Sequence, residues 1–449
     1  MKTKLYVVWL GMVVLALLLA GCGSGEASEE TAVSEPTVIA ETAIPTQTPV
    51  EEVPTDAPTA VPEPTEAPTQ IPTEVPTVAA PEHNLTDGCV DNYDPTVDYF
   101  PEKAVVTHTS GFTVEYGNNY KVVTVLAPYT GAEEPAQYLL VQCGTPAPEG
   151  FEQATLIEVP VTRFVAMSTT YLPALDVLGR LDALVGVDSG LYVSNETVRA
   201  MIADGRVAEV GSGADVNVET AVALEPDLIM TYASGFADYD AHPKLQEAGL
   251  TVVLNAEYLD PSPLGRAEWV DFIALFFNEE AVSEAWFAEM SADYEAVKTL
   301  AANAGERPTV FANTPFDGTW YMPGGQSFTA QMLADAGADY LWADDDSAPT
   351  LFLDFESVFE RAVDADYWIN IGFYGSLADL AAADERFQDF AAFQNGRVYN
   401  FDARVNENGG NDIYESGVIF PNVVLADLVK IFHPDLMPDH ELYYYRQME

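Results

Sequence analysis

The segment Arg163–Ser168 (RFVAMS) decides the fold, because it begins a rhythm of short apolar runs separated by helical patterns. The next runs are Leu181–Val187 (LDALVGV), Leu228–Met230 (LIM) and Val252–Leu254 (VVL). Short apolar runs that alternate with helices are typical of a parallel sheet covered by helices. The rhythm therefore predicts an α/β lobe over residues 162–278.

A second series of the same kind begins at Thr309–Ala312 (TVFA). It continues through Tyr340–Trp342, Tyr367–Ile371 and Val398–Phe401. The repetition predicts a second α/β lobe over residues 306–449, and both lobes are expected to be Rossmann-like.

One long helix is predicted between the lobes, over residues 279–305. Its apolar residues include Val282, Trp286, Met290 and Tyr294, which recur at helical spacing, and the segment has no Pro and no Gly until its end. About 25 residues at 1.5 Å each make a rod of ~38 Å. Such a helix is long enough to run across both lobes.

Residues 1–21 have the pattern of a lipoprotein signal peptide. Lys2 and Lys4 precede the apolar run Leu5–Ala20, which is shorter than the ~20 residues that span a bilayer and leads into Gly21 and Cys22. We expect cleavage before Cys22 and lipid modification of that residue, so that the chain is held to the cell membrane outside the cytoplasm. An uncleaved membrane anchor is the alternative.

Residues 22–82 are predicted to be a disordered linker. The stretch is dominated by Thr, Pro, Glu, Val and Ala, and from Gly23 to Glu82 it has 12 acidic residues and no Lys or Arg. This composition cannot bury a core, and its prolines favour extended conformations. The linker would act as a spacer between the membrane and the folded part.

Residues 83–161 are predicted to form a small β module. Phe112–Tyr116 and Tyr120–Val125 alternate apolar and polar residues on either side of a Gly-Asn-Asn turn, which indicates a hairpin. Cys89 and Cys143 are the cysteines left once Cys22 is lipidated, and an oxidising compartment favours a disulfide between them. Two free thiols, or half of a metal site, remain open as alternatives.

Charge and composition exclude several classes of function. The net charge of −53 argues against nucleic acid as a partner. The five His are scattered, so a His-rich metal site is not expected, and no Ser or Cys has a His beside it to act as a base. Asp344–Asp346 and Asn406–Asp412 are acidic enough for calcium but lack the periodicity of a calcium loop.

The two predicted lobes share one feature, a glutamate at the start of a helix that leads into a strand. Val218–Val222 (VETAV) precedes a strand in the first lobe, and Phe355–Phe359 (FESVF) precedes one in the second. Glu219 and Glu356 therefore hold equivalent positions. The simplest explanation is a favourable interaction of each carboxylate with its helix dipole.

Arg163–Ser168, Leu181–Val187 and Val218–Leu228 together resemble the substrate-binding lipoproteins of ABC importers in the iron-siderophore, haem and cobalamin class. The resemblance covers roughly residues 161–433 and implies two lobes joined by a rigid backbone helix. It also implies that Glu219 and Glu356 dock to arginines on the two subunits of a permease, which works with an ATPase. The protein is then expected to be a monomer that carries a metal chelate or a corrinoid, with no cofactor and no catalytic residue of its own.

Ligands of parallel α/β lobes bind beyond the carboxyl ends of the strands, where this sequence is rich in aromatic residues. Arg404 is expected there as a fork for an anionic ligand group, unless it is paired with Asp402, Glu407 or Asp412. The candidate ligand-binding residues at these ends are Ser168, Thr169, Thr170, Tyr171, Tyr192, Tyr232, Tyr258, Trp320, Tyr321, Tyr374 and Arg404.

Two other functions stay open at this point. An extracellular sensor or adhesive lipoprotein could use the same fold, and absent permease and ATPase genes nearby would favour it. A hydrolase would require a His or paired carboxylates that converge on the crevice between the lobes.

Overall fold

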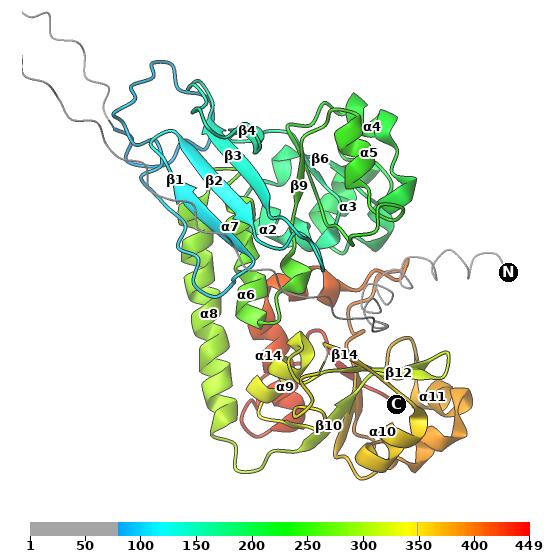
Figure 1. The fold of residues 1–449 in the computed structure, drawn as a ribbon. Helices are drawn as coiled ribbons and strands as arrows, with labels where there is room; N and C mark the ends of the chain where they lie inside the picture. The colour runs from blue at the N-terminus through cyan, green and yellow to red at the C-terminus, as the bar shows by residue number, and fades with distance from the viewer. Residues whose placement is uncertain (1–79, 348) are drawn as a thin grey trace, which may run out of the picture. The chain divides into compact units, whose positions relative to one another are not determined.

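The computed structural model describes residues 80–347 and 349–449. The predicted signal peptide, the lipidation site Cys22 and nearly all of the predicted linker lie outside the described residues. Figure 1 shows the described part as two α/β lobes with a four-stranded sheet beside the first.

The first lobe is built on a five-stranded parallel sheet in the order β7-β6-β5-β8-β9. Its central strand β5 is the fold-deciding apolar run, and all three of its residues are buried. The strands are β5 Phe164–Ala166, β6 Leu184–Val187, β7 Ala208–Glu209, β8 Leu228–Thr231 and β9 Val252–Leu254. The helices are α2 Leu172–Val177, α3 Glu196–Ala203, α4 Val218–Ala223, α5 His242–Glu247, α6 Pro263–Ala267 and α7 Trp269–Ala274, with short 3-10 turns at Thr169–Tyr171, Leu181–Ala183, Gly190–Tyr192, Gly213–Asp215 and Glu257–Leu259.

The second lobe has a five-stranded sheet in the order β13-β10-β15-β16-β17, in which β17 is antiparallel and the others are parallel. A small antiparallel sheet, β11-β12-β14, adds to it. The strands are β10 Thr309–Ala312, β11 Pro315–Phe316, β12 Thr319–Pro323, β13 Asp339–Tyr340, β14 Thr350–Leu353, β15 Tyr367–Ile369, β16 Val398–Asn400 and β17 Arg446–Gln447. The helices are α9 Phe328–Asp335, α10 Phe355–Ala362, α11 Leu377–Ala383, α12 Ala391–Gln394, α13 Ser416–Ile419 and α14 Pro421–Phe432, with 3-10 turns at Glu385–Asp389 and Asp412–Tyr414.

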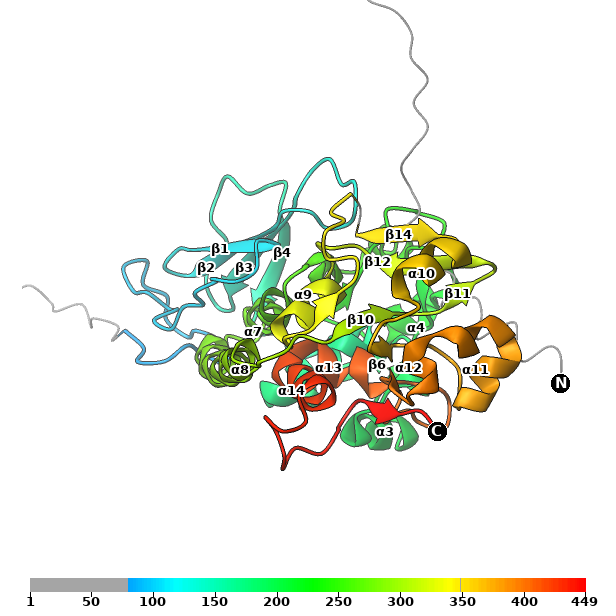
Figure 2. The same cartoon turned by 90° about the horizontal axis from the view of Figure 1, so that it is seen from below.

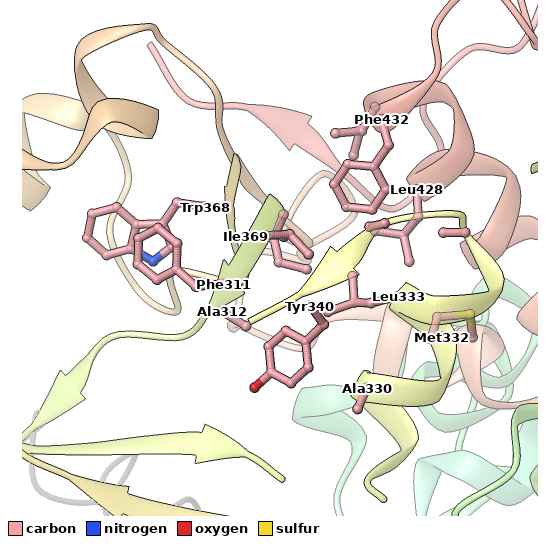
Figure 3. Packing of buried hydrophobic residues seen from close by; sticks show 14 of the residues in the cluster. Phe311, Ala312, Ala330, Met332, Leu333, Tyr340, Trp368, Ile369, Leu428 and Phe432 are labelled. Atoms are coloured by element: carbon pink, nitrogen blue, oxygen red, sulfur yellow. The ribbon is translucent and has the colours of Figure 1, made fainter. Parts of the chain in front are cut away.

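The core of the second lobe lies on both faces of its sheet (Figure 3). Phe311 and Trp368 stack on one face with ring centroids 4.9 Å apart. Leu333 of α9 and Leu428 of α14 pack from the other. Helices that cover both faces leave the strand ends as the natural place for a ligand.

The first sheet of the chain has the order β1-β2-β3-β4. One of its faces packs into the core of the first lobe, and the other covers a small separate cluster of Val122, Leu139 and Val141. Its strands are β1 Phe112–Tyr116, β2 Tyr120–Val125, β3 Ala136–Gln142 and β4 Thr155–Val159, and β4 pairs parallel with β3. Phe112 packs edge-to-face on Trp269 and Phe272 of α7, with ring centroids 5.0 and 5.3 Å apart. Cys89 and Cys143 form the expected disulfide, which ties the entry segment to the end of β3.

Helix α8, Glu280–Ala302, is the predicted long helix and packs on α7 and on α14 (Figures 1 and 2). Its first residue is fixed to the N-terminal sheet by a buried ion pair between Lys121 of β2 and Glu280. The Nζ of Lys121 also donates to the carbonyl of Leu275 at 2.7 Å and to Asn278 Oδ1 at 2.8 Å. The first sheet, α7 and α8 are therefore joined by buried polar contacts as well as by apolar packing.

Candidate functional site

The site in the first lobe begins where β5 ends. Ser168 caps the turn Thr169–Tyr171, and its Oγ lies 2.9 Å from Thr170 Oγ1. Thr170 Oγ1 in turn donates to Glu257 Oε1 at 2.7 Å. The end of β5 is thus linked to the segment that follows β9, at the edge of the sheet where both strands finish.

Tyr171 and Glu257 are both buried at this edge, with exposures of 1% and 7%. The hydroxyl of Tyr171 and Oε2 of Glu257 have no hydrogen-bond partner in the described part of the chain. Burial raises the pKa of Glu257, against the opposing effects of the Thr170 hydrogen bond and the charge of Arg266. Burial also raises the pKa of Tyr171 well above its ordinary value, and the neighbouring charge of Glu257 raises it further.

Three more oxygen-bearing side chains surround this pair. Asp188 follows β6, and burial raises its pKa to about 6. Tyr232 follows β8 and is half-buried, and burial together with Asp188 raises its pKa. Tyr258 donates its hydroxyl to the carbonyl of Ala233 at 2.7 Å. Ser168, Thr169, Thr170, Tyr171, Tyr232 and Tyr258, all predicted from the sequence, therefore occur at the carboxyl ends of strands in one lobe.

The second lobe corrects one prediction. Trp320 is fully buried in the core, where its Nε1 donates to the carbonyl of Ala312 at 2.9 Å, so it has no surface for a ligand. Successive residues of a strand point to opposite faces, and Tyr321 accordingly points away from that core and packs on the exposed Phe352 at 5.4 Å. Tyr321 and Tyr374 are both half-buried, whereas Phe373, next to Tyr374, is 82% exposed.

A loop of the second lobe, residues 404–415, holds the first lobe; we call it the clasp. Glu415 accepts hydrogen bonds from the backbone amides of Ser194 and Asn195, both at 2.7 Å. Asn406 Nδ2 donates to the carbonyls of Leu191 and Val193, at 3.2 and 3.1 Å. One side of the junction between the lobes is closed by these contacts.

Two residues of the clasp region carry further contacts between the lobes. Gly410 approaches so closely that a Cβ there would collide with the carbonyl of Tyr192. Glu407 forms an ion pair with Arg199 of α3. Burial raises the pKa of Glu415 to about 7, because a charged carboxylate is poorly solvated in this junction.

Arg404 lies in the clasp, and Tyr192 lies in the first-lobe segment that the clasp contacts. Arg404 Nε donates to Asp412 Oδ2 at 2.7 Å, and its guanidinium lies 4.2 Å from the ring centre of Tyr443. Of the alternatives left open, the salt bridge to Asp412 is the one that forms. Arg404 also lines a pocket of about 370 Å³ with Asp176, Glu196 and Tyr443. Tyr192 remains 39% exposed.

A second pocket, of about 270 Å³, opens next to α8. Its walls include His108, Tyr294, Lys298 and Asp335. Tyr294 donates to Asp335 Oδ2 at 2.7 Å, and Lys298 lies 3.4 Å from Oδ1 of the same carboxylate. Three of the polar side chains of this pocket are thus already paired with one another.

Glu219 and Glu356 are equivalent in three dimensions. Each is the second residue of its helix, α4 or α10, and each is exposed. Asn217 and Asp354 already cap the two helices, accepting from the amides of Thr220 at 3.0 Å and Ser357 at 2.7 Å. Neither glutamate is needed as the cap residue, and Glu356 pairs only loosely with Arg386, at 3.3 Å.

Metal ligands do not cluster in the described residues, where no group of three or more His, Cys, Asp or Glu is placed to hold an ion. The loops considered for calcium have protein partners instead, since Asp344 pairs with Arg361 and Asp345 accepts from Ser347. Over the same described residues, no helix has both the length and the hydropathy needed to cross a bilayer.

Residues 165–405, more than half of the chain, match the family described as periplasmic binding protein. The chain belongs to this family. Two uncharacterized lipoproteins of Methanocaldococcus jannaschii are similar to it: one is 25% identical over 65% of this chain and 69% of its own length, the other 29% identical over 70% and 80%. A solved periplasmic binding protein from Veillonella parvula has the same fold, with a TM-score of 0.50 and 15% identity over 74% of this chain and 98% of its own.

Periplasmic binding proteins bind solutes and do not catalyse reactions, so this chain is a solute-binding protein of the ABC-importer type. A permease and its ATPase are the partners that this role implies, and a small molecule is the cargo. The predicted fold class, two Rossmann-like lobes joined by one long helix, is confirmed.

Sequence reasoning missed Asp188, Glu257, Phe352, Phe373 and Glu415. Asp188 directly follows the apolar run of β6, so the rule used for the aromatic candidates could have found it. Glu415 gave no such signal, because its partners are backbone amides more than 200 residues away in the sequence.

Proposed function

We propose that this protein is an extracytoplasmic lipoprotein that captures a ferric siderophore, haem or a cobalamin-type ligand and delivers it to a permease. Glu219 and Glu356 dock to the two permease subunits, and the ligand occupies the crevice between the strand ends of the two lobes. Lipidation of Cys22 holds the protein at the cell membrane, and the lipoprotein relatives support this assignment.

The matched pair of glutamates carries the proposal. Both carboxylates are exposed at the second position of a helix that has a separate cap residue, so neither is needed as the cap. Two equivalent acidic points, one per lobe, suit a receptor that presents both lobes to a dimeric permease.

The ligand crevice is supported by the exposed aromatic side chains near the strand ends of both lobes. Tyr192 and Tyr239 belong to the first lobe, and Phe352 and Phe373 to the second, with exposures between 39% and 82%. Exposed aromatic surface of this kind suits a broad chelate, macrocycle or corrin.

Charge reversal tests the docking role. The double variant E219R/E356R should lose transport while its affinity for the ligand stays unchanged, because neither carboxylate lies among the strand-end residues. The control R386A removes the partner of Glu356, together with its bonds to Asp384 and its packing on Phe355, and should still transport normally. Normal uptake by the double variant would refute the docking role.

A melting screen tests the cargo. Ferric siderophores, haem and cobalamins should be compared for their effect on the melting temperature of the soluble protein, and a bound ligand at 100 times its Kd should add about 2.7 kcal/mol to the free energy of unfolding. A screen in which none of these ligands raises the melting temperature would refute the ligand class.

A further inference from the structure

The first lobe has buried polar atoms that lack hydrogen-bond partners. Among the described residues these include the hydroxyl of Tyr171, Oε2 of Glu257 and Nε of Arg266. Buried polar groups in folded proteins nearly always have a partner, so an unpartnered one calls for an explanation such as strain, a functional role or a bound species. Tyr171 and Glu257 follow the ends of β5 and β9. Their unpartnered oxygens therefore lie at the edge of the sheet where the proposed ligand binds.

Hydrogen-bond acceptors dominate the surroundings of these atoms. Asp188 and the phenol of Tyr232 lie close enough to Tyr171 to raise its pKa together with Glu257. Asp240 is also nearby, although its carboxylate is occupied by Ser234 and Gly235. Of the carboxylates in this region, Glu257 is the one with a buried oxygen that lacks a donor among the described residues.

The one nearby guanidinium is held elsewhere. Arg266 Nη2 donates to the carbonyls of Tyr258 and Asp260, both at 3.0 Å, and the group lies 4.3 Å from the ring centre of Phe328 in α9. His242 Nδ1 is 4.0 Å from Asp240 and has no hydrogen bond within the described residues. Neither side chain donates to the open oxygen of Glu257.

We propose that Glu257 and Tyr171, with Asp188 beside them, bind a positively charged N–H group on the ligand, so that the cargo is a cationic chelate. A protonated amine supplies hydrogen-bond donors to the Tyr171 hydroxyl oxygen and to Oε2 of Glu257, which both lack a partner. The half-buried rings of Tyr232 and Tyr258 also favour a cation next to them. The inference rests on the proposed function and narrows its ligand class to chelates that carry a protonated amine.

A matched pair of chelates tests the charge preference. Ferrioxamine B carries a free protonated amine, and its N-acetyl derivative is the same iron chelate without that charge. Isothermal titration should show that the wild-type protein binds the amine form about 10-fold more tightly, and ferric dicitrate more weakly than either. E257Q and Y171F should lose most of this preference, whereas the control E247Q, which removes an exposed charge from α5, should keep it.

The melting temperature of the ligand-free protein separates a binding role from a structural one. Because Oε2 of Glu257 is buried without a donor, E257Q should melt at the same or a higher temperature than the wild type while it loses the amine preference. A lower melting temperature of E257Q would mean that Glu257 serves the fold, and would overturn the proposal.

The outcomes for the two proposals differ. If ferric dicitrate, haem or cyanocobalamin binds more tightly than ferrioxamine B, or if the amine and acetylated forms bind equally, the cationic class is refuted and the proposed function stands. If no chelate, haem or cobalamin binds the wild-type protein, the proposed function is refuted and this inference falls with it.

Discussion

The two lobes share a fold but differ in the side chains that lie at the ends of their strands. The first lobe ends its strands in hydroxyls, phenols and carboxylates, several of them buried and some without partners, such as Tyr171 and Glu257. The second lobe presents exposed rings, such as Phe352 and Phe373, around a fully packed aromatic core. The strand ends of one lobe are therefore mainly polar and those of the other carry exposed apolar rings, which a sequence pattern common to both lobes does not reveal.

The largest effect expected in the second lobe comes from its core. W320A should lower the free energy of unfolding by about 4 kcal/mol, because Trp320 is fully buried among Phe311, Trp368 and Phe390. Y321A, one residue away on the opposite face, should cost far less stability. Urea unfolding of the two variants measures the difference, and equal losses would contradict the assignment of Trp320 to the core.

Beside the first lobe, the largest expected loss of stability comes from breaking a buried ion pair. K121M should cost about 3 kcal/mol, because it leaves Glu280 buried without its charge partner. The double variant K121M/E280Q should recover part of that loss, since no uncompensated charge remains. Chemical denaturation of the three proteins checks this, and a double variant no more stable than K121M would show that packing, and not charge, sets the cost.

The clasp that joins the lobes should make stability depend on pH. The pKa of Glu415 is about 7 in the folded protein, above its ordinary 4.5, so the folded state holds the proton more tightly. Its contribution to stability is then complete below pH 4.5 and is lost as the pH rises through 7. Between pH 5 and pH 8, E415Q should lose about 2 kcal/mol less stability than the wild type.

Thermal melts at pH 5 and pH 8 measure this difference. The control E407Q changes an exposed carboxyl of the same loop, whose pKa is lowered, and should keep the wild-type slope. Part of the dependence should survive in E415Q, because burial also raises the pKa of Asp188 to about 6 and of Asp271 to about 7. Identical slopes for E415Q and the wild type would refute the role of Glu415.

The smallest effect concerns the exposed rings of the second lobe. F373A should leave stability nearly unchanged, because the side chain is 82% exposed, yet weaken ligand binding by about 1 kcal/mol if the ring contacts the cargo. F316A changes a less exposed ring on β11 and is the matched comparison. Isothermal titration with the ligand found in the melting screen decides whether Phe373 belongs to the crevice.

Strand positions were the most predictable part of the molecule. The apolar runs at 164–166, 184–187, 228–230 and 252–254 all lie in strands, and the long helix predicted over 279–305 occurs as Glu280–Ala302. The exception is Tyr340–Trp342, where the strand covers only Asp339–Tyr340 and Trp342 turns into the core. The local hydrophobic pattern was sufficient to predict a strand wherever an apolar run was bounded by turns.

Side-chain direction was much less predictable. Trp320 and Tyr321 are consecutive residues inside β12, and both were expected to face the ligand, although a strand presents neighbours to opposite faces. Aromatic residue type did not distinguish core from crevice, because the second lobe uses many rings to fill its interior.

The sequence by itself determined the two-lobe α/β fold, the long helix, the cysteine pair and the equivalence of Glu219 and Glu356, because each follows from local spacing or from residue type. Only the tertiary structure decided which strand-end residues are open, that Arg404 is paired with Asp412, and that the clasp reaches the first lobe from about 200 residues away. Burial and hydrogen-bond partners depend on which distant segments pack together, and no local pattern in the chain specifies those contacts.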